Sequence, residues 1–173
     1  MLSMAGFVSG ATVDVYKESG SVSAHRFSSP EEIDIGPDGE IYVADNNNHA
    51  IKAFKETGEK IFSIGGTAGT GTGKFKNPTG IARDKEGNVW VVDQNNHRLQ
   101  KYTGTGAYLD ELGSSYGDYK NAGSFLLDAP HDMALDTDGN YWIADQYNHR
   151  VVIVTPEGKQ VKIIEKTVDE KVY

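Results

Sequence analysis

The sequence predicts an all-β fold of four-stranded antiparallel blades, the unit from which a β-propeller is built. A ten-residue segment recurs three times, as DNNNHAIKAF, DQNNHRLQKY and DQYNHRVVIV. The residues before each copy also recur, as PEEIDIGPDGEIYVAD, PTGIARDKEGNVWVVD and PHDMALDTDGNYWIAD. The equivalent histidines His49, His97 and His149 follow one another at intervals of about 50 residues, close to the length of a propeller blade.

Each repeat contains four short apolar segments separated by turn residues. The first strands are expected at Glu32–Ile35, Gly80–Arg83 and Asp132–Asp136. A D-G or E-G turn, which is a strong hairpin signal, then leads to the second strands IYVA, VWVV and YWIA. The next turn contains Asn and Asp, which tolerate a left-handed backbone, and third strands such as Ile51–Phe54 follow it. The fourth strands are expected at Lys60–Ile64, Tyr108–Leu112 and Lys159–Ile164.

The polar residues of the repeated turn invite two interpretations. Asp93 and His97 alone would suit a metal or catalytic site, but the same residue types occur once in every repeat. A catalytic site is seldom present in each blade, so we expect these side chains to fasten strands together. The structural residues are Asp45, Asn48, His49, Asp93, Asn96, His97, Asp145, Asn148 and His149.

The repeats divide the chain into alternating blades and connections. Blades are expected at 27–64, 78–112 and 130–164. A Gly-rich loop at 65–77 and a second loop at 113–129 connect them, and a tail follows at 165–173. Residues 1–26 contain ATVDVYKESGSVSAHRF, which aligns with the outer two strands of a blade, so the chain is expected to hold about three and a half blades.

Composition narrows the classes of function. The 173 residues carry a formal net charge of −8, which disfavours nucleic acid or an anionic membrane as partner. The chain has no cysteine, which excludes disulfides, thiol nucleophiles and Cys-ligated zinc. There is no basic residue before Lys17 and no apolar run of about 20 residues, so neither a signal peptide nor a membrane span is expected. A cytoplasmic location is the expectation that follows.

The repeated text resembles the NHL repeat. Its pattern is P-x-x-ϕ-x-ϕ-D-x-x-G-x-ϕ-ϕ-ϕ-x-D-x-x-N-x-R-ϕ, where ϕ is apolar, and the Asn-His pairs stand at Asn48-His49, Asn96-His97 and Asn148-His149. The resemblance covers Phe27 to about Ile164 and implies a β-propeller, used as a binding scaffold.

Three repeats are fewer than the four to eight blades of closed propellers, so two apolar blade faces are left without a neighbour. Two kinds of partner could supply the missing blades. One is a second copy of the chain, as in a homodimer that completes a six-bladed ring. The other is the remainder of a longer propeller.

Candidate binding residues lie in connections, where propellers recognise protein or peptide ligands. The loop 113–129 contains Tyr116 and Tyr119, which suit exposed contacts. The turn residues Asn47, Asn95 and Tyr147 are further candidates, and tyrosine replaces asparagine at this position in the third repeat. The Gly-rich loop ends in GTGTGK but lacks the Ser or Thr and the following helix of a phosphate-binding loop, so a flexible connection is expected.

One position after the blade-starting proline breaks the pattern, because it holds Glu31, Thr79 and His131. The sequence PHDMALDTDGNYWIAD resembles a blade of the peptidyl-α-hydroxyglycine α-amidating lyases, propellers whose Pro-His-Asp turns supply zinc ligands. That resemblance implies His131 as a zinc ligand, with Asp132 and Tyr147 as candidate catalytic residues. One such histidine instead of three does not complete a zinc site.

The expected function is therefore a non-catalytic binding or assembly module without a cofactor. The alternative is a zinc-dependent lyase centred on His131. RNA binding, known for some NHL domains, is a third class, but the acidic charge and the scattered Arg83, Lys85, Arg98 and Lys101 disfavour it.

Overall fold

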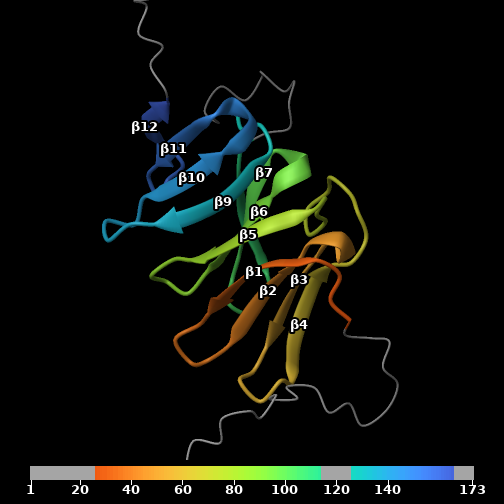
Figure 1. Ribbon diagram of the computed structural model, residues 1–173. Coiled ribbons are helices and arrows are strands. Elements are labelled where there is room, and N and C mark those ends of the chain that lie inside the picture. Colours follow the sequence, from red (N-terminus) through yellow and green to blue (C-terminus); the bar gives the residue numbers. More distant parts are fainter. Residues whose placement is uncertain (1–25, 114–125, 166–173) are drawn as a thin grey trace, which may run out of the picture.

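In the computed structural model the described residues are 26–113 and 126–165, and they form three four-stranded antiparallel sheets (Figure 1). The first sheet contains β1 (Pro30–Ile35), β2 (Ile41–Asp45), β3 (Ala50–Phe54) and β4 (Lys60–Gly65). The second contains β5 (Pro78–Arg83), β6 (Val89–Asp93), β7 (Arg98–Tyr102) and β8 (Tyr108–Leu112). The third contains β9 (Pro130–Leu135), β10 (Tyr141–Asp145), β11 (Arg150–Val154) and β12 (Gln160–Glu165).

The sheets are consecutive blades around the innermost strands β1, β5 and β9. Strand β5 lies between the other two and contacts both, while the later strands of each sheet extend outwards in chain order (Figure 1). This arrangement confirms the prediction of an all-β fold made of four-stranded antiparallel blades. The half-blade expected at residues 1–26 lies almost wholly outside the described residues.

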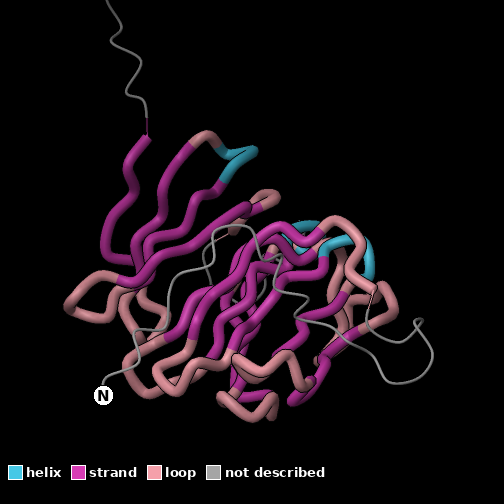
Figure 2. Tube along the Cα trace, turned by 60° about the horizontal axis from the view of Figure 1, so that its bottom comes forward, coloured by secondary structure: helices cyan, strands magenta, loops and turns pink. Residues whose placement is uncertain are grey.

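A 3-10 turn connects the second and third strands of every blade. These turns are η1 (Asn46–Asn48), η2 (Gln94–Asn96) and η3 (Gln146–Asn148). They occur at equivalent ends of the three sheets (Figure 2). We call the side of the molecule that carries η1 to η3 and the first residues of β1, β5 and β9 the turn face. The opposite side, where hairpins join the first and second strands, is the hairpin face.

The first hairpin of each blade requires glycine. Gly39, Gly87 and Gly139 have φ values of 83°, 82° and 85°, in the left-handed region that side chains disfavour. The D-G and E-G pairs of the sequence therefore identified the hairpin turns correctly.

The core consists of two apolar layers, one between each pair of adjacent blades. Tyr42, Ile51, Val91 and Tyr102 are buried in the layer between the first and second blades. Between the second and third blades, Trp90 and Tyr141 pack with ring centroids 4.7 Å apart.

The sequence placed the inner strands two residues too late, because each strand begins at its proline, Pro30, Pro78 or Pro130. Proline has no N–H to donate and is tolerated as the first residue of a strand. The assignment of 65–77 and 113–129 as loops also missed two core residues. Phe75 is 0% exposed and Leu127 is 1% exposed, and each lies in the layer against the preceding blade.

Helical structure in the described ranges is limited to the three short turns. None of the helices found there has the length and apolar character needed to cross a membrane.

Candidate binding face

The turn face is held by one buried aspartate in each blade. Asp93 is fully buried, accepts a hydrogen bond from the backbone N–H of Lys76 at 2.7 Å, and accepts a second from the Asn96 amide at 2.8 Å. Asp45 receives the equivalent bonds from Ser28 and Asn48. The equivalent donors to Asp145 are Asp128 and Asn148.

A cation on the third strand compensates each of these carboxylates. The guanidinium of Arg98 lies 3.0 Å from Asp93, and Lys52 and Arg150 make the equivalent ion pairs with Asp45 and Asp145. Burial raises the pKa of the Asp93 carboxyl, while hydrogen bonds from Lys76, Asn96 and Arg98 oppose that rise.

The histidine after each turn has a backbone role and links neighbouring blades. His49, His97 and His149 have φ values of 52°, 57° and 53°, so the left-handed residue is the histidine and not, as expected, Asn or Asp. The N–H of Asn77 donates to Nδ1 of His49 at 3.1 Å, and the N–H of Ala129 donates to Nδ1 of His97 at 3.0 Å. The histidines therefore fasten one blade to the next, rather than one strand to another within a blade.

At the tip of each 3-10 turn one side chain faces solvent. Asn47, Asn95 and Tyr147 occupy this position, and all three are exposed, Tyr147 by 65%. Their backbone N–H groups donate to carbonyl oxygens of the preceding connection, at distances of 3.0, 3.0 and 3.1 Å. The tips are thus fixed by the backbone, and the third blade carries a tyrosine where the other two carry asparagine.

Amide side chains connect the turns across the blades. Asn77 donates to Asn46 at 2.8 Å and accepts from Asn95 at 2.9 Å. Gln94 donates to Gln146 at 3.4 Å, which joins η2 to η3. The turn face therefore presents an uncharged network of hydrogen-bond donors and acceptors.

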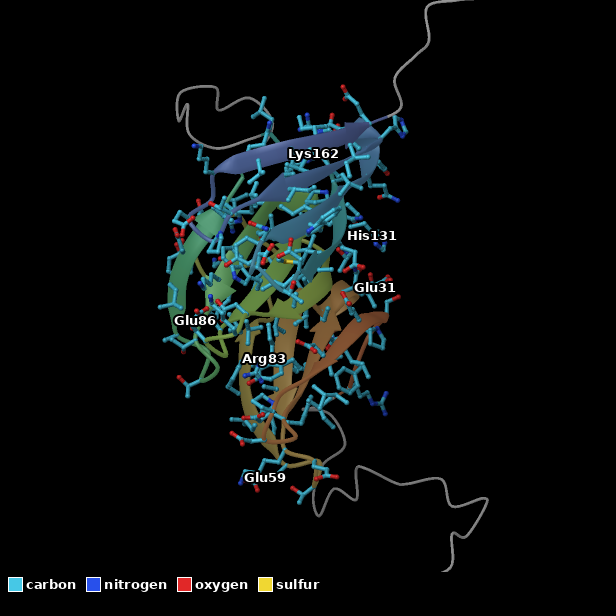
Figure 3. The ribbon with its side chains drawn as sticks, turned by 90° about the vertical axis from the view of Figure 1, so that its left-hand side faces the viewer. Glu31, Glu59, Arg83, Glu86, His131 and Lys162 are labelled. Carbon is cyan, nitrogen blue, oxygen red and sulfur yellow. The ribbon has the colours of Figure 1, made fainter. Side chains whose placement is uncertain are left out.

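The residues after the blade-starting prolines lie next to this network. Glu31 and His131 are exposed at one edge of the molecule, and Glu86 of the hairpin face lies at the opposite edge (Figure 3). Thr79 holds the same position on the middle strand β5 and is buried. Its hydroxyl donates a hydrogen bond to the carbonyl oxygen of His131 at 2.6 Å.

One residue further along these strands is an acidic pair that sequence reasoning missed. Glu32 accepts a hydrogen bond from the N–H of Ile81 at 2.9 Å, and its pKa is raised to about 7 by burial and by the neighbouring Asp132. Between them, Gly80 holds the equivalent position of the second blade, where a Cβ atom would lie 3.2 Å from Asp132 Oδ1. The signal available in the sequence was the shared offset of these three residues from the prolines.

The structure brings together only part of the predicted site. His131 lines an open hollow of about 590 Å³ with Asp145, His149 and Arg150, and Tyr147 does not line it. Tyr116 and Tyr119 lie outside the described residues. Among residues 26–113 and 126–165 there is no group of three or more His, Asp or Glu side chains placed to hold a metal ion. His131 and the residues around it therefore do not make the three-ligand set of a catalytic zinc site on one described chain.

The Gly-rich loop is hydrogen-bonded to the second blade. The side chain of Arg98 donates to the carbonyl oxygens of Gly71 and Lys74, both at 3.1 Å. Gln100 donates to Lys74 and accepts from the N–H of Gly73. The carbonyl oxygens of Gly71 and Lys74 are therefore bound by side chains of strand β7.

The family comparison places one repeat on each blade. The NHL repeat model matches residues 27–54, 75–102 and 127–154. Each match begins at Phe27, Phe75 or Leu127 and ends with the third strand of its blade.

Relatives among characterised proteins match only locally. The chain is 39% identical over 41 residues to the peptidylglycine alpha-amidating monooxygenases of Rattus norvegicus and Mus musculus. The match covers 24% of this chain and 4% of either enzyme.

Several solved structures share the fold. A catalytically inactive virginiamycin B lyase from Staphylococcus aureus with quinupristin gives a TM-score of 0.63 at 16% identity, over 84% of this chain and 44% of the lyase. A putative exported protein from Bacteroides fragilis gives a TM-score of 0.63 at 14% identity, over 86% of this chain and 40% of that one. The hydrazine synthase of Kuenenia stuttgartiensis gives 0.61 at 12% identity, with the same two coverages. The chain thus spans less than half of each structure. It contains three NHL repeats, and each of them folds as a propeller blade.

Proposed function

We propose that the chain is a non-catalytic NHL-type module that binds a protein or peptide segment on its turn face. The observation that supports this proposal is a constant frame that holds one exposed residue at the tip of each turn, with a tyrosine at that position in the third blade. The buried aspartates, their amide partners and the left-handed histidines recur in every blade. The exposed tip residue is asparagine in the first two blades, at Asn47 and Asn95, and Tyr147 in the third. A rigid scaffold that holds exposed side chains in fixed positions is suited to recognition.

The chemistry of the turn face favours an extended peptide. Amide side chains such as Asn95 and Gln146 offer both donors and acceptors to a peptide backbone. Tyr147 supplies a large amphipathic contact surface. The carboxyl groups of Glu31, Glu32 and Asp132 favour a lysine or arginine in the peptide at the point where the inner strands begin. Tyr116 and Tyr119 belong to the same proposal as further contacts.

Selection from a displayed library of random linear peptides tests the proposal. The immobilised full chain is expected to enrich peptides that contain a basic residue. Synthetic versions are then titrated by fluorescence anisotropy against the wild type, Tyr147→Ala and Asn95→Ala. Tyr147→Ala should weaken binding by about tenfold or more, in the manner of an exposed aromatic anchor.

The control is Asp138→Ala, an exposed residue of the hairpin face. It should leave the affinity unchanged. Equal binding by the wild type and Tyr147→Ala, or no enrichment at all, would remove the turn face as the binding surface. The double variant Tyr116→Ala, Tyr119→Ala tests the loop contribution in the same titration, with weaker binding expected.

A second candidate is a lyase-type enzyme, favoured by the local similarity to the amidating monooxygenases and by the exposure of His131. Because the described chain offers one histidine at this position, the enzyme would need ligands from elsewhere. Metal analysis of the purified chain after equilibration with zinc and dialysis decides the point. Stoichiometric zinc that is lost in His131→Ala would favour this candidate over the binding module.

A further inference from the structure

The contacts between neighbouring blades repeat in register, so each blade has two defined surfaces. We call the surface towards the next blade the leading face and the surface towards the previous blade the trailing face. Trp90 lies on the leading face of the second blade and packs on Tyr141 of the trailing face of the third. The same strand positions hold Trp142 in the third blade and Ile41 in the first.

Two surfaces in the described structure have no neighbouring blade, the trailing face of the first blade and the leading face of the third. Ile33 is 59% exposed on the first blade, whereas its equivalents Ile81 and Met133 are 3% and 5% exposed. Trp142 is 38% exposed on the third blade, whereas Trp90 is 1% exposed. Apolar side chains that are buried at the internal junctions are thus solvent-exposed at both ends.

The hydrogen bond between blades is also left incomplete at both ends. Asn77 and Ala129 donate their N–H groups to the histidine of the preceding blade, and both have positive φ values. Ser29 is their equivalent, with φ 54°, and its N–H donates to no group among the described residues. Nδ1 of His149 likewise receives no hydrogen bond from the described part of the chain. Within the described residues, one donor and one matching acceptor therefore have no partner.

A third feature is an apolar hollow on the third blade. It corresponds to the site, here called the seat, that holds Phe75 on the first blade. Phe75 packs in one cluster with Ala44, Ile51 and Ile64 of the preceding blade. The equivalent side chains of the third blade line the open hollow of about 590 Å³ beside His149; they are Ala144, Val151 and Ile164. No described side chain of a following blade fills this hollow as Phe75 fills the first seat.

The seat of the third blade differs from the other two in charge. Gly65, the last residue of β4, and Gly113, which follows β8, lie beneath Phe75 and Leu127, whereas Glu165 stands at the corresponding place in the third blade. The residue that precedes Phe27 is the exposed Arg26. A first blade placed on this seat would bring Arg26 towards Glu165, so that opposite charges meet.

We propose that a second copy of this chain covers these surfaces head to tail. The trailing face of the first blade of one copy packs on the leading face of the third blade of its partner. Ser29 then donates to the partner's His149, and the segment at Phe27 enters the partner's hollow. Two such contacts related by a twofold axis close a ring of six blades and leave no blade face uncovered. This inference is independent of the proposed binding function, and Tyr147→Ala should leave the assembly unchanged.

Sedimentation velocity and native mass spectrometry of the full chain measure the assembly. We expect a dimer whose dissociation constant rises about 100-fold or more in Ile33→Lys, because a charge would be buried at the contact. Val161→Lys is the matched control, since Val161 is also 59% exposed and its equivalent Leu109 stays 47% exposed beside an internal junction. A monomeric wild type, or equal effects of both substitutions, would overturn the proposal.

Cross-linking tests the head-to-tail geometry without relying on a destabilised variant. The chain has no cysteine, so Ile41→Cys and Trp142→Cys introduce single thiols at positions whose equivalents meet inside the chain. Oxidation of a mixture of the two variants should give a disulfide-linked dimer, and oxidation of either variant alone should not. Same-variant cross-links, or no cross-link, would each contradict the head-to-tail contact.

Discussion

The carboxylate of Glu32 accepts a hydrogen bond from the backbone N–H of Ile81 at 2.9 Å, and this bond joins the first blade to the second at their innermost strands. Asp132 of the third blade lies close enough to raise the pKa of Glu32 further, after burial has already raised it. The side chain of Glu32 therefore interacts with groups from all three blades. Its protonation is coupled to their packing.

We expect the stability of the chain to fall between about pH 4.5 and pH 7 because of Glu32. The pKa is 4.5 for an ordinary glutamate, as in the unfolded chain, and about 7 for Glu32 in the folded protein. Within that window the folded state binds more protons than the unfolded state, so the free energy of unfolding decreases as the pH rises. Glu32→Gln should remove this contribution, about 1 kcal/mol after allowance for solvent screening.

Urea unfolding of the wild type and Glu32→Gln across pH 4.5–7.5, at one protein concentration, measures the difference. Glu31→Gln, an exposed neighbour on the same strand, is the control and should follow the wild type. Parallel stability curves for the wild type and Glu32→Gln would contradict the coupling.

Gly80→Ala should destabilise the fold by about 1–3 kcal/mol through overpacking. A Cβ atom at this position would lie 2.8 Å from Val92 Cγ2 and 3.1 Å from the backbone Cα of Asp132. Neither atom is at the free end of a flexible side chain. Thermal unfolding followed by circular dichroism measures the loss.

Gly71→Ala is the matched control for this substitution. A Cβ atom on Gly71 meets nothing within 4 Å, and its backbone is not in the left-handed region. Its effect should lie within about 0.5 kcal/mol of zero, or be slightly stabilising. A similar loss in both variants would show that close packing at Gly80 is not the cause.

Asp93→Ala should cost about 3 kcal/mol, because the guanidinium of Arg98 loses its buried charge partner and keeps only the more exposed carboxylate of Glu111. The amide donors Asn96 and Gln100 lose the same acceptor. Urea unfolding should show a lower midpoint with an unchanged dependence on urea concentration. Asp110→Ala, on an exposed strand of the same blade, should change stability by less than about 0.5 kcal/mol.

Trp90→Ala should lower the free energy of unfolding by about 3–5 kcal/mol. The indole packs on Tyr141 across the junction of the second and third blades and lies beneath the ammonium group of Lys101, which is 5.2 Å from its ring. Differential scanning calorimetry, with Leu109→Ala as an exposed control, measures the effect. A loss no larger than that of the control would mean that this junction contributes little to the core.

The repeat made the blades predictable from the sequence, because alternating apolar residues and D-G turns are local signals. The role of His49 and His97 was not local. Their imidazoles bind N–H groups 28 and 32 residues later, across a boundary between blades. Residue type alone could not separate a fastener within a blade from a link between blades.

The positions of side chains near the prolines were also not predictable from the sequence. Phe75 stood at the end of a Gly-rich loop, and nothing in that composition indicated that its ring is buried. Its equivalence to Phe27 and Leu127, each three residues before a proline, was the available signal. The pairing of Glu32 with Asp132 depended on the curvature of three blades about a common centre, which no single repeat encodes.

The bond between each buried aspartate and the connection before it has a consequence for biosynthesis. Ser28 and Asp45, Lys76 and Asp93, and Asp128 and Asp145 are each separated by 17 residues. Such low contact order favours rapid local folding, and each of these hydrogen bonds can form soon after its aspartate leaves the ribosome. The link from His49 to Asn77 can form only after a further 28 residues have been synthesised. We therefore expect the blades to fold one after another during synthesis, each packing on the blade that folded before it.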